Sequence, residues 1–74
     1  MTDKIEISLL ALLYQYGMLN VLEIKNKINA EFIIIEARIE DMIEKGLIQY
    51  FPNSTGRFVY ITIAGYKDYL VIRE

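Results

Sequence analysis

The sequence predicts a small α+β fold, mostly α-helical, with three helices followed by a β-hairpin and a C-terminal helix. Two observations predict it. Apolar residues recur at helical spacing in three successive segments up to residue 45, and capping residues or glycines separate these segments. Strand-like alternation then occurs on both sides of a turn-forming stretch, residues 52–56. The 74 residues leave room for one domain, which we expect to span 1–74.

The first helix is expected between Asp3 and Gly17. Asp3 with Glu6 three residues later is a capping-box pattern, and Gly17 suits the left-handed residue that ends a helix. Leu10 and Tyr14 lie off the main apolar stripe, so this helix is apolar on more than one side. The stripe that we expect in the core consists of Ile5, Leu9, Leu12, Leu13 and Tyr16.

Two further helices are expected before residue 46. Asn20 and Glu23 form a second capping pattern, which opens a short helix that runs to about Ile28. The third helix follows a turn at Asn29 and stops at Gly46. The residues expected in the core are Val21, Ile24 and Ile28 from the short helix, and Phe32, Ile35, Ile39 and Met42 or Ile43 from the third.

The hairpin and the last helix follow directly. Leu47 and Ile48 begin a half-buried strand, and the returning strand places Phe58 and Tyr60 on one face. Asn53 and Gly56 are available in the loop for positive φ angles. Thr62 is expected to cap a helix from Ile63 to about Ile72.

The composition narrows the function classes. The chain has no Cys and no His, which removes thiolate chemistry, the commonest general base and the commonest metal ligand. We therefore expect no enzyme, no metal centre and no cofactor. No apolar run approaches the roughly 20 residues that span a bilayer, and the first residues lack a secretory signal pattern. A cytoplasmic protein without a membrane partner is the expectation.

Two segments carry a resemblance to a known superfamily. Residues Ile39 to Ile48 are similar to the "Leu-x-x-Leu-x-x-x-Gly-Leu-Ile" close of the recognition helix in winged helix-turn-helix regulators of the MarR, PadR and ArsR kind. Residues Ile61 to Leu70 are similar to the "Leu-Thr-x-x-Gly-x-x-x-Leu" segment after the wing of those regulators. The resemblance covers nearly the whole chain. It implies a winged helix-turn-helix with three helices, a β-hairpin wing and a C-terminal helix, and a small transcription regulator that binds double-stranded DNA as a homodimer.

The resemblance also implies which residues meet DNA. The exposed face of the third helix would enter the major groove, and Arg57 occupies the position of a wing arginine that reaches the minor groove. The DNA-binding residues expected on this basis are Lys25, Lys27, Ile33, Ile34, Ala37, Arg38 and Arg57. The third helix departs from the pattern of these regulators in charge. Residues 31–45 carry five acidic side chains against two basic ones, a local net charge of −3 that DNA phosphates would repel.

This charge leaves a second hypothesis open, in which the winged helix is a protein-interaction module. Glu36, Glu40 and Glu44 recur at four-residue spacing and form an acidic stripe on the third helix. Ile33, Ile34 and Ile35 are consecutive, and a helix cannot direct three consecutive residues inward. The stripe with Ile33 and Ile34 would suit a protein partner that has a basic surface. A solvated acidic face is the simpler alternative.

A homodimer interface is expected on the terminal helices. The chain is 54% apolar, which is more than a domain of this size buries easily by itself. Terminal helices mediate dimerisation in the regulators that the chain resembles. The residues expected in the interface are Leu10, Tyr14, Tyr66, Tyr69, Leu70 and Ile72.

Overall fold

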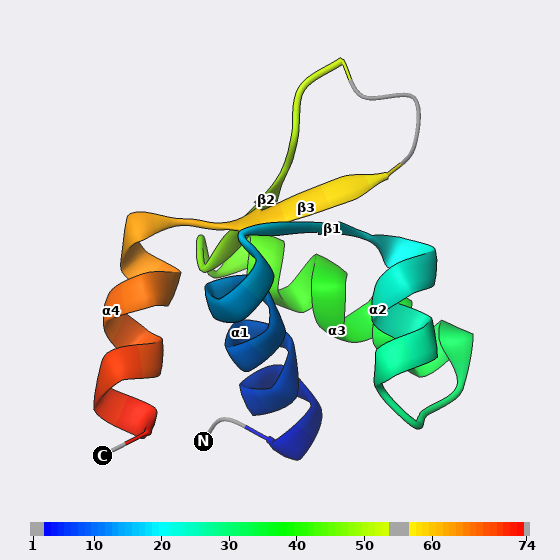
Figure 1. The fold of residues 1–74 in the computed structure, drawn as a ribbon, viewed down its shortest axis with the longest axis horizontal. Helices are drawn as coiled ribbons and strands as arrows, with labels where there is room; N and C mark the ends of the chain where they lie inside the picture. The colour runs from blue at the N-terminus through cyan, green and yellow to red at the C-terminus, as the bar shows by residue number, and fades with distance from the viewer. Residues whose placement is uncertain (1–2, 54–56, 74) are drawn as a thin grey trace.

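The structure, a computed structural model, describes residues 3–53 and 57–73. In this part of the chain, helices pack beneath a three-stranded antiparallel sheet, and a β-hairpin projects from the sheet away from the helices (Figure 1). The elements in chain order are α1 (Lys4–Tyr16), β1 (Met18–Asn20), α2 (Val21–Lys27), α3 (Phe32–Glu44), β2 (Ile48–Tyr50), β3 (Phe58–Ile61) and α4 (Ile63–Ile72). The predicted fold class, α+β and mostly α, is confirmed.

The sheet contains one strand that the sequence pattern did not predict. The strand order is β1-β3-β2, so the predicted hairpin gains β1 as a third strand. Leu19 of β1 lies opposite Val59 of β3, which in turn lies opposite Tyr50 of β2. β1 has three residues, too few to show alternation, and it becomes a strand because β3 provides its hydrogen-bonding partner.

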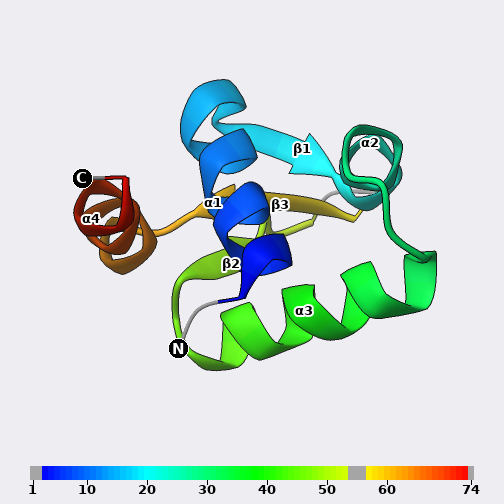
Figure 2. The ribbon, with the colours of Figure 1, turned by 90° about the horizontal axis from the view of Figure 1, so that it is seen from below.

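Helix α1 lies in the middle of the molecule, which explains why it is apolar on several sides. It packs against α3, α4 and strand β3 (Figure 2). Leu10 is therefore completely buried in the core, and its predicted place in a dimer interface is wrong. Tyr16 and Phe32 were predicted in the core but are exposed, because each lies at an end of its helix beyond the packed region. The core contains Leu9, Leu10, Leu13, Leu19, Val21, Ile24, Ile35, Ile39, Met42, Ile48 and Val59.

The predicted capping residues are confirmed. The Asp3 carboxylate accepts a hydrogen bond from the Glu6 backbone N–H at the start of α1. Asn20 and Glu23 form a complete capping box at the start of α2. Gly17 and Gly46 end α1 and α3 with φ angles of 83° and 79°. In the wing loop Asn53 has a φ of 61°, whereas Gly56 lies outside the described residues.

A tight junction joins the end of α3 to the start of α4. The Thr62 hydroxyl accepts a hydrogen bond from the Gly65 N–H and lies 2.6 Å from the carbonyl oxygen of Gly46. The Thr62 N–H donates to the carbonyl oxygen of Leu47. Gly65 is buried against this segment, and a Cβ atom at Gly65 would overlap the Leu47 carbonyl oxygen. These contacts fix the position of α4 relative to α3.

No helix in residues 3–53 or 57–73 has the length and apolar character needed to cross a membrane.

Candidate nucleic-acid interface

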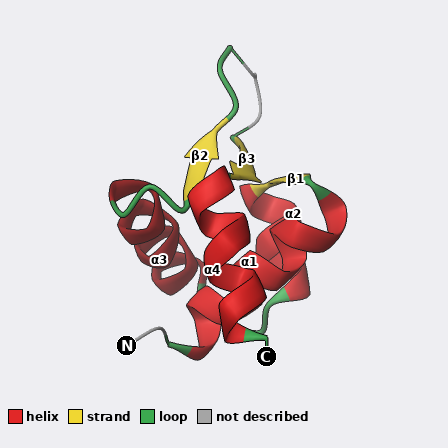
Figure 3. Ribbon diagram, turned by 90° about the vertical axis from the view of Figure 1, so that its left-hand side faces the viewer, coloured by secondary structure: helices red, strands yellow, loops and turns green. Residues whose placement is uncertain are grey.

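Helix α3 and the hairpin form one continuous outer surface. Figure 3 shows the hairpin standing above the helices, with α3 running past its base. The backbone N–H of Val21, at the start of α2, donates to the carbonyl oxygen of Arg57, so the base of the hairpin is also attached to α2. The surface thus combines α2, the outer side of α3 and the hairpin.

The start of α3 is apolar on its outer side. Ile33 is 71% exposed and Ile34 is 39% exposed, while Ile35 is buried in the core. The prediction that at least one of these residues is exposed is confirmed. Ile33 lines a shallow hollow together with Lys25 of α2, so these two residues belong to the same surface.

A small apolar hollow lies between α2, the start of α3 and the base of the hairpin. Its volume is about 180 Å³, and it is lined by Asn20, Val21, Leu22, Phe32 and Arg57. Leu22 and Phe32 are both exposed, which gives the hollow an apolar rim. The sequence pattern did not predict this feature, because it depends on how the hairpin docks against the two helices.

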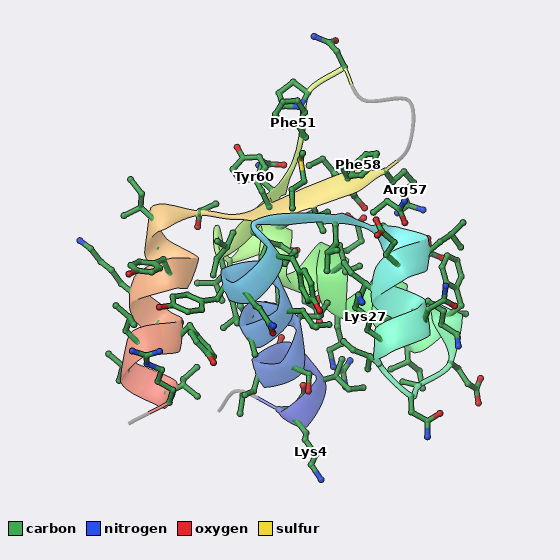
Figure 4. All side chains as sticks on the ribbon, in the orientation of Figure 1. Lys4, Lys27, Phe51, Arg57, Phe58 and Tyr60 are labelled. Atoms are coloured by element: carbon green, nitrogen blue, oxygen red, sulfur yellow. The ribbon has the colours of Figure 1, made fainter. Side chains whose placement is uncertain are left out.

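Arg57 binds the acidic stripe of α3. One guanidinium nitrogen lies 2.6 Å from a Glu36 carboxylate oxygen, and the other lies 2.8 Å from the Tyr50 hydroxyl oxygen. The second nitrogen is also 3.9 Å from a Glu40 carboxylate oxygen. The Tyr50 hydroxyl donates to Glu40 at 2.7 Å, which closes a ring of contacts. Figure 4 shows Arg57 at the base of the hairpin, near the start of α2.

The pKa values of Arg57 and Tyr50 are both raised in this cluster. The hydrogen bond to Tyr50, followed by the one to Glu36, raises the pKa of Arg57, so the guanidinium remains charged. Burial raises the pKa of the Tyr50 hydroxyl, which therefore remains protonated at neutral pH and is able to donate to Glu40. The group therefore contains one cation and two carboxylates.

The other predicted basic residues are partly engaged. Arg38 forms an ion pair with Asp3 at the start of α1, so it points toward α1 and away from the hairpin. The Lys27 ammonium lies 4.8 Å from the ring centre of Tyr16. Lys25 and Lys27 lie on different sides of α2. Ala37 is exposed on α3, and Glu44 forms no ion pair with any described residue.

The aromatic residues assigned to a dimer interface contact one another within the chain. The ring of Tyr14 stacks on that of Tyr66 at 5.3 Å and lies 4.9 Å from the ring of Tyr69. Tyr69 and Ile72 also pack against the core. The most exposed apolar residues of α4 are instead Ile63, at 76%, and Val71, at 73%. The sequence pattern did not predict which side of α4 is covered by α1.

The uncovered face of the sheet carries aromatic side chains. Phe51, Phe58 and Tyr60 project from the hairpin on the side away from the helices (Figure 4). The rings of Phe51 and Tyr60 meet edge to face at 6.4 Å. The predicted shared face of Phe58 and Tyr60 is confirmed, with Val59 buried on the opposite side.

The arrangement of helices and hairpin matches that of several solved structures. A mutant MarR from E. coli in complex with operator DNA is 15% identical in sequence and matches with a TM-score of 0.83, over 95% of this chain and 52% of that chain. YusO from Bacillus subtilis is 22% identical, with a TM-score of 0.81 over 97% of this chain and 55% of that chain. The fold is a winged helix-turn-helix. The predicted winged helix-turn-helix fold is thereby confirmed.

A third solved structure shares the fold over nearly the whole chain. A possible transcriptional regulator for arsenical resistance is 18% identical, with a TM-score of 0.71 over 99% of this chain and 82% of that chain. No protein-family model matches the sequence, and no curated protein matches it either. The chain spans about half the length of the MarR chains that its winged helix matches.

Proposed function

We propose that this winged helix is a DNA-binding transcription regulator that acts as a homodimer. The observation that carries the proposal is the match to MarR bound to operator DNA, which extends over 95% of this chain. Arg57 and Tyr50 of the hairpin contact Glu36 and Glu40 of α3, so helix and hairpin adjoin, and their outer side is the one expected to approach the duplex.

The described contacts suggest how the predicted DNA-binding residues divide. Lys25 and Ile33 share a hollow, so an ammonium group and the start of α3 can meet the same stretch of DNA. Ile33, Ile34 and Ala37 offer apolar contacts, for which thymine methyl groups are the matching base feature. Arg57 lies at the base of the wing and is placed for a phosphate or the minor groove. Arg38 and Lys27 would first have to leave Asp3 and Tyr16.

A salt titration of binding to random-sequence duplex DNA tests the proposal. Fluorescence anisotropy is measured from low salt to about physiological salt. We expect micromolar or tighter binding at low salt that weakens steeply as salt rises, because basic side chains displace condensed counterions from the phosphates. Absence of binding even at low salt would contradict the proposal.

The wing contact has its own test in the variant Arg57→Ala. If Arg57 contacts a phosphate, its removal should weaken binding to all sequences and reduce the salt slope by about 1. Lys4→Ala is the matched control, since Lys4 is an exposed cation at the start of α1, far from the wing (Figure 4). Equal effects of the two substitutions would mean that Arg57 makes no specific contact.

One set of observations favours a second candidate, a protein-interaction module. Ile33 is largely exposed, the hollow beside Leu22 and Phe32 is apolar, and Glu44 has no ion pair among the described residues. A partner with an apolar side chain flanked by basic residues would match these features. Ile33→Ser would abolish binding of such a partner yet leave sequence-independent DNA binding almost unchanged, so this variant separates the two candidates.

A further inference from the structure

The acidic stripe of α3 already has a basic partner in the same chain, namely the wing. Glu36 and Glu40 both direct a carboxylate oxygen at the Arg57 guanidinium, at 2.6 and 3.9 Å. The contacts join residues that are distant in sequence and bring the base of the wing onto the recognition helix. Two of the three carboxylates in the stripe therefore belong to an intramolecular network.

We propose that Glu36 and Glu40 retain Arg57 on α3 and so compete with DNA phosphates for it. This inference rests on the proposed DNA-binding function and concerns the control of that same surface. In the free protein the carboxylates occupy the arginine that would otherwise hold the DNA backbone. Sequence-independent binding is thereby kept weak, and only a site that supplies further contacts displaces them.

Charge supports this inference. The cluster of Glu36, Glu40 and Arg57 carries a net charge of −1, so a phosphate that approaches Arg57 also meets an excess carboxylate. The side chains of Arg57 and Glu36 are 51% and 32% exposed, so salt screens their interaction and its effect on DNA binding is largest at low salt. A guanidinium has five N–H donors, and Glu36 and Tyr50 occupy two of them at hydrogen-bond distance. Arg57 thus keeps N–H donors that could bind DNA, but the two neighbouring carboxylates repel an approaching phosphate.

Tyr50 links the two carboxylates to the arginine. Its hydroxyl accepts a hydrogen bond from Arg57 and donates one to Glu40, so both of these residues are held by one group on β2. The guanidinium carbon also lies 5.5 Å from the centre of the Tyr50 ring. Tyr50→Phe removes the hydroxyl without changing any charge, so it tests whether Arg57 is held on α3 independently of the charge of the surface.

The test compares Glu36→Gln with Glu44→Gln in the full chain. Both substitutions remove one negative charge from α3, but only Glu36 contacts Arg57. Affinity for random-sequence duplex DNA is measured by anisotropy at low salt. We expect Glu36→Gln to raise the affinity about tenfold and Glu44→Gln about twofold, since only the first releases a cation as well as removing a charge. Tyr50→Phe should also raise the affinity.

A double-mutant cycle with Arg57→Ala isolates the contact. In the Arg57→Ala background, the gain from Glu36→Gln should fall to that from Glu44→Gln, because no arginine remains to be released. Equal gains from the two glutamine variants in the wild-type background would overturn the retention and leave DNA binding intact. Weaker binding by Glu36→Gln would also overturn it, because Glu36 would then position Arg57 for DNA. Absence of DNA binding by every variant would overturn the proposed function, and this inference with it.

Discussion

At the scale of single residues, Arg57 shows how much a side chain's role depends on its neighbours. The sequence placed it at the base of the wing, and the structure does the same. Its contacts with Glu36 and Glu40 were not predictable, because they join a hairpin to a helix 17 or more positions away in sequence. From the sequence alone, the acidic stripe indicates either a solvated face or a face that is free for a partner. Both hypotheses omitted the wing of the same chain.

Gly65 leads to a prediction about stability. A Cβ atom there would overlap the Leu47 carbonyl oxygen and lie 2.9 Å from an Ile61 side-chain carbon. Backbone cannot move aside as a flexible side chain does, so Gly65→Ala should destabilise the fold by about 3 kcal/mol. Gly17→Ala is the control, with open space but a positive φ, and should cost about 1 kcal/mol. Urea unfolding followed by circular dichroism measures both. Equal losses would contradict the prediction.

Asp3 leads to a prediction about pH. The hydrogen bond from the Glu6 N–H, with the neighbouring Arg38, lowers the pKa of Asp3 below its ordinary 3.8 in the folded state. Ionised Asp3 therefore stabilises the fold fully above that ordinary pKa, and this contribution is lost as the pH falls through the lowered value. Asp3→Ala should cost about 1 kcal/mol at neutral pH and progressively less below about pH 4. A loss that is independent of pH would show that the carboxylate charge plays no part.

At the scale of elements, capping residues and apolar spacing in the local sequence predicted the helices well. Strand β1, in contrast, forms through pairing with a distant strand. The starts of α1, α2 and α4 follow from Asp3, Asn20 and Thr62, each of which caps the residues next to it. Strand β1 depends on pairing with β3, some forty positions later in the chain. Three residues carry no pattern of their own, so no reading of the local sequence would have found it.

The junction before α4 gives a prediction at this scale. The Thr62 hydroxyl caps α4 through Gly65 and lies within hydrogen-bond distance of the carbonyl oxygens of Gly46 and Leu47. Thr62→Val keeps the side-chain shape but loses these hydrogen bonds, and we expect a loss of about 1–2 kcal/mol. Thr62→Ser retains the hydroxyl and should lose much less. The free energy of unfolding in urea distinguishes them, and similar losses would exclude a capping role.

At the scale of the whole molecule, packing decided which apolar residues are available to a second copy. The sequence placed Leu10, Tyr69 and Ile72 in a dimer interface, but all three contribute to the packing of a single chain. The large apolar residues of α4 that stay exposed are Ile63, Val71 and Tyr66, and of these Tyr66 is one of the residues predicted in the interface. Both faces of α1 and α4 are apolar, so periodicity alone does not distinguish the covered side from the open one.

The proposed homodimer is tested through this outer side of α4. Lys67 and Asp68 lie between Ile63 and Val71, so two antiparallel copies of α4 could pair opposite charges beside apolar contacts. At tens of micromolar, sedimentation should show twice the 8.7 kDa chain mass. Ile63→Ser combined with Val71→Ser should yield the single chain, whereas Leu22→Ser, an exposed apolar residue on α2, should not. A wild-type protein that sediments only at 8.7 kDa would exclude the dimer.

The order of the strands has a consequence for how the chain acquires its fold. β3 lies in the centre of the sheet, yet it is the last of the described strands to be synthesised. Before the ribosome has synthesised β3, β1 and β2 have no strand to pair with, although the residues of α1, α2 and α3 have all been synthesised. A nascent chain that ends before residue 58 would therefore hold helices without the sheet that covers their core residues. We infer that the domain folds in one cooperative step, which takes place only after its central strand, β3, has been synthesised.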